Sequence, residues 1–142
     1  MAKSELQKSG EILNQSAIYQ TQAWGEKNQA DFYNAVIRYK TNSIPTILLK
    51  QIKKYETAIG RKKTYKWGPR EIDIDILFCD GISVNLPDLK IPHTAIINRK
   101  FVLQPMAELD RNYIIPGTDK TISNFLEECP DNIGIQKLNL SW

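Results

Sequence analysis

The chain has 142 residues, of which 42% are hydrophobic and 25% are charged, and its formal net charge is +3. These totals are typical of one globular domain that buries its own core, so we expect residues 1–142 to form a single domain, with neither a membrane span nor a secreted disulfide framework. The mild positive charge permits an anionic small-molecule ligand but is weaker than the basic bias typical of nucleic-acid-binding domains.

The first half of the chain predicts two helices and two strands. A short helix is expected over residues 1–9, followed by one strand over residues 12–21 and a second over residues 31–41. Pro45 then opens a helix that extends to about residue 59. Three-to-four spacing predicts that one face of this helix is buried, and its apolar positions are Ile44, Ile47, Leu48, Ile52, Tyr55 and Ile59.

The second half predicts shorter elements. A strand is expected over residues 72–79, with an Asp80-Gly81 turn leading into a short strand over residues 82–84. Helices are expected over residues 99–109, despite Pro105, and from about residue 121 to 129, and a last strand over residues 135–140. Helices and strands in this order predict an α+β fold, an α/β sandwich in which helices pack on a mainly antiparallel sheet.

The most informative segment is residues 66–77, in which isoleucine and aspartate alternate from Ile72 onward. Alternation with period two predicts a half-buried strand that places Asp73 and Asp75 on one face, roughly 7 Å apart. Neighbouring carboxylates repel each other, and a pair of Mg²⁺ ions would relieve that repulsion because hard cations take carboxylate oxygens and leave positions for water and phosphate. The alternative, a solvated strand face without metal, stays open from the pattern alone.

A basic segment directly before the aspartates favours a polyphosphate ligand. It contains Arg61, Lys62, Lys63, Lys66 and Arg70. An acidic pair that holds cations, together with a basic loop, supplies the charges that phosphoryl chemistry requires.

Further segments complete a pattern. In chain order they are residues 19–25 (YQTQAWG), residues 29–36 (QADFYNAV), Gly60-Arg61, Trp67-Gly68-Pro69-Arg70, Ile91-Pro92-His93, and residues 98–103 with Pro105. With Asp73 and Asp75 they resemble the 6-hydroxymethyl-7,8-dihydropterin pyrophosphokinase family, from residue 1 to about residue 116.

The resemblance implies a ferredoxin-like α/β sandwich and a reaction in folate biosynthesis. The enzyme would transfer the β,γ-diphosphate of ATP to the hydroxymethyl group of the pterin and release AMP, with two Mg²⁺ ions. Asp73 and Asp75 would hold both metals, and Arg61 and Arg70 would neutralise the charge that develops on the transferring phosphates. The pterin hydroxyl is the nucleophile, so no protein nucleophile is required.

The resemblance also implies a pterin site. Two aromatic rings would clamp the heterocycle while an amide and a hydroxyl read its edge. Taken alone, Phe32 is more typical of a plain core aromatic than of a ligand site, and Asn34 on the same strand face shifts that balance. The residues implied are Thr21, Ala23, Trp24, Phe32, Asn34 and Phe101.

The implied ATP site is spread over the chain. His93 would contact ATP phosphate beside Arg99, and Trp67 would lie on a loop that closes over the reactants. Without the resemblance, His93 would be an ordinary surface histidine, and Leu49, Lys53 and Glu56 an ordinary helix surface. The residues implied are Leu49, Lys53, Glu56, Arg61, Lys63, Trp67, Arg70, Ile76, His93 and Arg99.

The chain departs from the family at its start. Family members begin with a strand and a Gly-Ser-Asn loop, whereas this sequence begins within the first helix. We therefore expect an N-terminally truncated domain, because an interior strand would otherwise have to come from the C-terminal segment or a second chain. Lys63 also stands where a second loop arginine is common.

Two other functions are weighed beside the enzyme. A truncated, non-catalytic paralogue would bind pterin or ATP without turnover. A small RNA-binding module is disfavoured, because acidic residues occupy the strand that would meet phosphates. We expect small-molecule substrates, no nucleic-acid or membrane partner, a cytoplasmic location, and a monomer unless a strand is exchanged.

Overall fold

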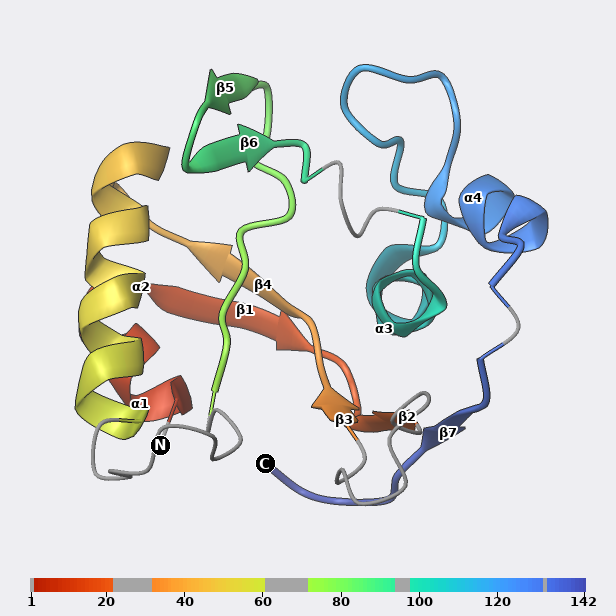
Figure 1. Cartoon of the computed structure of the whole chain (residues 1–142), viewed down its shortest axis with the longest axis horizontal. Coiled ribbons are helices and arrows are strands. Elements are labelled where there is room, and N and C mark those ends of the chain that lie inside the picture. Colours follow the sequence, from red (N-terminus) through yellow and green to blue (C-terminus); the bar gives the residue numbers. More distant parts are fainter. Residues whose placement is uncertain (1, 22–31, 61–71, 94–97, 132) are drawn as a thin grey trace.

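A computed structural model of the chain describes residues 2–21, 32–60, 72–93, 98–131 and 133–142. Within these ranges, the chain forms helices and short antiparallel strands, which confirms the α+β class (Figure 1). The elements are α1 (Ala2–Gln7), β1 (Glu11–Gln15), β2 (Tyr19–Thr21), β3 (Phe32–Asn34), β4 (Ile37–Lys40), α2 (Pro45–Gly60), β5 (Val84–Leu86), β6 (Leu89–Ile91), α3 (Lys100–Asp110), α4 (Ile122–Glu128) and β7 (Ile135–Lys137).

The two long strands expected in the first half are each divided. β1 pairs with β4, whereas β2 pairs with β3 on one side and β7 on the other, all antiparallel. Gln15 lies opposite Ile37 and Tyr19 opposite Asn34, so three residues of one strand face two of the other. The predictions of continuous strands over residues 12–21 and 31–41 were therefore wrong, because this bulge interrupts both.

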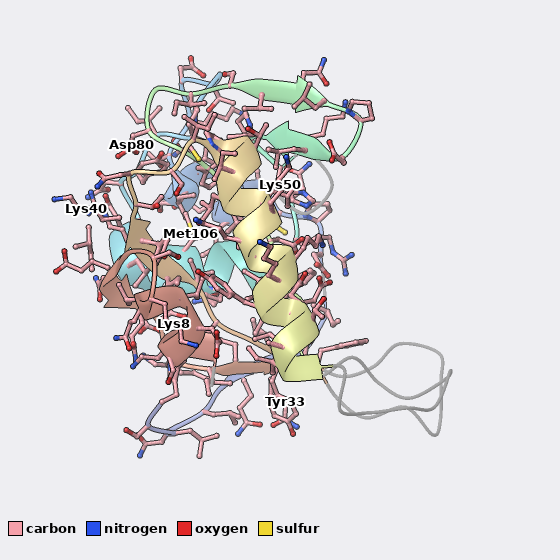
Figure 2. All side chains as sticks on the ribbon, turned by 90° about the vertical axis from the view of Figure 1, so that its left-hand side faces the viewer. Lys8, Tyr33, Lys40, Lys50, Asp80 and Met106 are labelled. Carbon is pink, nitrogen blue, oxygen red and sulfur yellow. The ribbon has the colours of Figure 1, made fainter. Side chains whose placement is uncertain are left out.

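Helix α2 begins at Pro45, as predicted, and lies over β1 and β4 on one side of the molecule (Figure 1). Its inner face contributes Leu48 and Ile52 to a core cluster with Leu6 of α1. The predicted apolar stripe is only partly buried, because Ile44 and Ile47 remain 63% and 43% exposed. Figure 2 views α2 from outside and labels Lys50, an exposed residue of this helix.

The aspartate segment differs most from expectation. Residues 72–78 carry no assigned strand, and Cys79 forms only an isolated bridge with Ile82 across the predicted Asp80-Gly81 turn. Its backbone is hydrogen-bonded outside any described sheet: Leu77 O accepts from His93 N at 3.0 Å. The prediction of a strand over residues 72–79 was therefore wrong, although half-buried and exposed side chains still alternate along residues 72–76.

The strand predicted over residues 82–84 lies later, at Val84–Leu86, and pairs with Leu89–Ile91. No strand was predicted at Leu89–Ile91, because Pro87 and Pro92 flank it. Both helices of the second half are as predicted. Helix α3 accommodates Pro105, and Thr121 caps α4 by accepting from Asn124 N. They enclose a second core cluster of Leu103, Ile115 and Ile122.

Among the described residues, no helix is long and apolar enough to cross a bilayer.

A partly buried hydrogen bond joins α3 to β2. The Tyr19 hydroxyl donates to Glu108 Oε1 at 2.7 Å, and Ala17 N donates to Oε2 of the same carboxylate at 3.0 Å. Lys137 of β7 lies 3.6 Å from Glu108 Oε1. Burial, with the hydrogen bond to Glu108 and its negative charge, raises the pKa of Tyr19 to about 12.

Because of the raised pKa of Tyr19, we expect the protein to lose stability at alkaline pH. The folded-state pKa of Tyr19 lies above the unfolded value of about 10, so its contribution is complete below pH 10 and is lost as pH rises towards 12. We expect the free energy of unfolding of the wild type to fall by about 2 kcal/mol more than that of Tyr19→Phe between pH 9 and 12, measured by urea denaturation.

Tyr33→Phe is the control, because Tyr33 is 58% exposed on the neighbouring strand. An equal fall in the free energy of unfolding of the wild type and of Tyr19→Phe between pH 9 and 12 would mean that Tyr19 does not cause the loss of stability.

Candidate active site

The two aspartates lie on the outer side of residues 72–76. Asp73 and Asp75 are exposed, whereas Ile72, Ile74 and Ile76 are half-buried. Ile74 and Ile76 pack against the core cluster of Leu6, Leu48 and Ile52. The alternation predicted from the sequence is therefore present, and both carboxylates are accessible to a ligand.

Glu56 of α2 holds this segment against the helix. Its Oε2 accepts a hydrogen bond from Ile74 N at 2.8 Å, and its Oε1 lies 3.2 Å from Lys53 Nζ. The Glu56 side chain is only 13% exposed, whereas that of Lys53 is 60% exposed. Glu56 therefore positions the backbone between the two aspartates, while Lys53, which is paired with Glu56, remains largely exposed beside it.

An open pocket of about 230 Å³ lies between α2, the aspartate segment and the β5–β6 hairpin. Several residues predicted for ATP line it, which brings together positions separated by more than forty residues in the sequence. The lining consists of Leu49, Lys53, Ile74, Asp75, Ile76, Pro87, Asp88, Leu89, Lys90 and His93.

His93 lines this pocket from the second position after β6. Its Nε2 lies 3.8 Å from Asp75 Oδ1, and its Nδ1 is buried with no hydrogen-bond partner among the described residues. The His93 side chain is only 26% exposed and lines the pocket. The pocket therefore presents a carboxylate, an imidazole and a lysine side by side.

The described residues contain no group of three or more His, Cys, Asp or Glu side chains that could hold a metal by itself. Asp73 and Asp75 nevertheless supply exposed carboxylate oxygens, which are the ligands that Mg²⁺ prefers. Magnesium commonly binds through one or two carboxylates and completes its coordination with water and substrate phosphates. The donor set thus suits a metal that arrives with a nucleotide.

The predicted pterin residues lie on other elements. Thr21, 3% exposed, is opposite Phe32 in the β2–β3 pair. Asn34 follows Phe32 by two positions, so both side chains belong to the same face of β3. Phe32 is 50% exposed, which rules out the plain core aromatic.

Phe101 lies in the first turn of α3, next to Arg99. The Arg99 guanidinium carbon is 5.1 Å from the centroid of the Phe101 ring, which is a cation–π arrangement. Arg99, predicted for ATP, and Phe101, predicted for the pterin, are thus brought together.

Six predicted site residues lie outside the described residues: Ala23, Trp24, Arg61, Lys63, Trp67 and Arg70.

Sequence reasoning missed the β5–β6 hairpin as part of the pocket. Asp88 and Lys90 line it, yet no strand was predicted over residues 89–91. The signal available was the pair of apolar residues Leu89 and Ile91 flanking Lys90, which is a short alternating pattern.

The fold and the pocket define a class of protein. An α+β chain with paired, exposed carboxylates beside a pocket that carries lysine and histidine is arranged as an enzyme for an anionic, phosphate-bearing substrate. Residues 1–111 match the family described as 7,8-dihydro-6-hydroxymethylpterin-pyrophosphokinase. The chain belongs to this family.

Curated relatives agree with that match. The chain is 41% identical over 127 residues to the 2-amino-4-hydroxy-6-hydroxymethyldihydropteridine pyrophosphokinase of Aquifex aeolicus, covering 89% of this chain and 79% of that one. It is 36% identical to the protein of the same name from Methylorubrum extorquens, covering 89% and 78%. It is also 34% identical to the folic acid synthesis protein FOL1 of Dictyostelium discoideum, covering 94% of this chain and 20% of that one.

Proposed function

We propose that this protein transfers the diphosphate of ATP to the hydroxymethyl group of 6-hydroxymethyl-7,8-dihydropterin, in folate biosynthesis. The observation that carries the proposal is the pocket in which Asp75, His93 and Lys53 meet, in a chain whose family is named for this activity. The protein is a pyrophosphokinase that acts on small molecules, with ATP as co-substrate.

The reaction requires one bond to form and one to break. The hydroxymethyl oxygen of the pterin attacks the β-phosphorus of ATP and loses its proton, while the bond from that phosphorus to the oxygen shared with the α-phosphate breaks. AMP leaves, and the β- and γ-phosphates remain together on the pterin. The chain has mainly to position two reactants and stabilise negative charge.

Asp73 and Asp75 are the proposed ligands of two Mg²⁺ ions. When bound, these ions shield the charge of the polyphosphate and orient it. The exposed carboxylates on the outer side of residues 72–76 support this role. His93 and Lys53, which line the same pocket, would contact the phosphates, and Leu49 and Ile76 would provide its apolar wall.

Glu56 is proposed to support the ATP site by accepting the hydrogen bond from Ile74 N. Arg99 is proposed to contact a phosphate of ATP. The charged Arg61, Lys63 and Arg70, with Trp67, are proposed for ATP from their place in the sequence pattern. Thr21, Phe32, Asn34 and Phe101, with Ala23 and Trp24, are proposed for the pterin.

We further propose that the fold is ferredoxin-like and that residues 1–142 act as one domain and as a monomer. Antiparallel strands with helices packed against them support the fold. The cytoplasmic location expected from the sequence stays a prediction. The two alternative functions are not favoured, because family membership gives no support to an RNA-binding module or to a non-catalytic paralogue.

The proposal is tested by incubating the purified chain with ATP, Mg²⁺ and 6-hydroxymethyl-7,8-dihydropterin and measuring AMP by chromatography. We expect one AMP per pterin diphosphate and none without the pterin. ADP in place of AMP would mean transfer of a single phosphate, and binding of both ligands without AMP would favour the non-catalytic alternative.

A further inference from the structure

The segment that carries Arg99 is tied to a loop far along the chain, after α4. Asp131 Oδ2 accepts a hydrogen bond from Arg99 Nε at 3.0 Å and from Lys100 N at 3.2 Å. The Cys129 thiol donates to Asn98 O at 3.1 Å. Residues 98–100 are therefore held by the loop that begins at residue 129, beyond the residues matched by the family.

The Asp131 carboxylate is itself firmly placed. Its second oxygen, Oδ1, accepts from Ile133 N at 3.1 Å, and Ile133 is only 7% exposed. The Asp131 side chain is 15% exposed, and its bonds to Lys100 N and Ile133 N are partly buried, whereas its bond to Arg99 lies at the surface. Partial burial alone would raise the pKa of Asp131, but the hydrogen bonds from Arg99, Ile133 N and Lys100 N and the Arg99 charge outweigh it, so the pKa is lowered.

Arg99 is held on two sides. Asp131 engages its Nε, and the ring of Phe101 lies 5.1 Å from its guanidinium carbon. A guanidinium has five N–H donors, and one N–H from each of its two Nη atoms forms the end-on edge that can grip phosphate bidentately. With Nε occupied and the side chain 47% exposed, Arg99 can present that edge to a ligand.

We propose that Asp131 is a positioning residue, which fixes Arg99 against Phe101 with its Nη edge turned to the polyphosphate of the nucleotide. The proposal rests on the proposed function, in which Arg99 serves ATP and Phe101 serves the pterin. Asp131 would then hold Arg99, which contacts ATP, in a fixed position relative to Phe101, which contacts the pterin.

Charge and orientation predict opposite effects at this position. Removing the Asp131 carboxylate makes the surroundings of Arg99 more positive, which by charge alone would tighten the binding of an anionic nucleotide. Losing the hydrogen bond to Nε frees the Arg99 guanidinium to rotate. Nucleotide binding would then be weaker, because it would have to order this side chain at a cost in conformational entropy. The direction in which the affinity for nucleotide changes therefore distinguishes an effect of charge from an effect of orientation.

The test compares Asp131→Asn with Glu128→Gln in the full chain. Glu128 forms an exposed ion pair with Lys120 at 2.8 Å, so its replacement makes the same change of charge in the same part of the chain. We expect the KM for ATP to rise roughly tenfold in Asp131→Asn, as for the loss of one charged hydrogen bond, with kcat changed much less and with no rise in Glu128→Gln.

Asp131→Glu keeps the charge and moves the carboxylate by one methylene, so it remains informative if Asp131→Asn fails to fold. We expect it also to raise the KM for ATP. In an Arg99→Ala background, Asp131→Asn should change the KM for ATP by less than about twofold, because the residue through which it acts is gone.

A KM that falls or stays unchanged in both Asp131 variants, or that rises equally with and without Arg99, would overturn the proposal. These results require an active wild type. A wild type that releases no AMP would instead refute the proposed function itself, and with it the assignment of Asp131.

Discussion

Replacement of Asp75 by alanine is expected to lower kcat by about 10³-fold, which corresponds to about 4 kcal/mol of lost transition-state stabilisation. Asp75 lines the pocket, lies 3.8 Å from the imidazole of His93 and is one of two proposed magnesium ligands. Its side chain is 47% exposed, so the loss should not come from unfolding, and the thermal midpoint should stay close to that of the wild type.

Metal binding is a second readout that does not need turnover. Mn²⁺ replaces Mg²⁺ at oxygen-rich sites and is detected by electron paramagnetic resonance. We expect Asp75→Ala, in the presence of a non-hydrolysable ATP analogue, to bind Mn²⁺ much more weakly than the wild type.

Asp119→Ala is the matched control, because Asp119 is an exposed aspartate in the loop before α4. It should retain both turnover and Mn²⁺ binding. Turnover by Asp75→Ala at the rate of the wild type would remove the argument for metal at the aspartate pair.

Replacement of Ile115 by alanine is expected to lower the free energy of unfolding by about 3–4 kcal/mol, or the thermal midpoint by about 10 °C. Ile115 is fully buried beside Leu103 and Ile122, in the cluster that joins α3 to α4. The lost methylene contacts and the cavity that they leave both add to the cost. Urea denaturation followed by circular dichroism measures it.

The adjacent residue is an unusually close control. Ile114 has the same side chain but is 57% exposed, so Ile114→Ala should cost less than about 1 kcal/mol. Equal losses at the two positions would mean that this cluster does not stabilise the fold. The cluster includes Leu103 of α3, the helix whose first turn carries Phe101. We therefore expect Ile115→Ala to have the kcat of the wild type at temperatures well below the thermal midpoint of the variant, and to lose activity as that midpoint is approached.

Helices were the most predictable part of the fold. The Pro45 start of α2, the tolerated Pro105 in α3 and the Thr121 cap of α4 are local signals, decided within a few residues. Strand pairing was less predictable. The bulge that divides the first two strands depends on which residues face each other across the sheet, and no single-strand pattern contains that register.

The candidate site shows the same division. Alternation of isoleucine and aspartate correctly predicted which side chains face the core and which face outwards. It did not predict that Glu56 would hold Ile74 N, or that residues 72–78 would lie outside any described sheet. Asp131 had no signal at all, since it meets Arg99 across 32 positions of sequence.

By itself, the sequence determined the residue types and local spacings of this protein: the acidic pair, the basic segment before it, the helix boundaries and the family to which the chain belongs. Only the tertiary structure decided that Lys53, Asp75 and His93 share one pocket with the β5–β6 hairpin, and that Asp131 holds Arg99. The physical reason is that spacing along a chain constrains only neighbours within a turn or a strand. Packing of the core brings distant segments together, and the contacts between them follow from that packing.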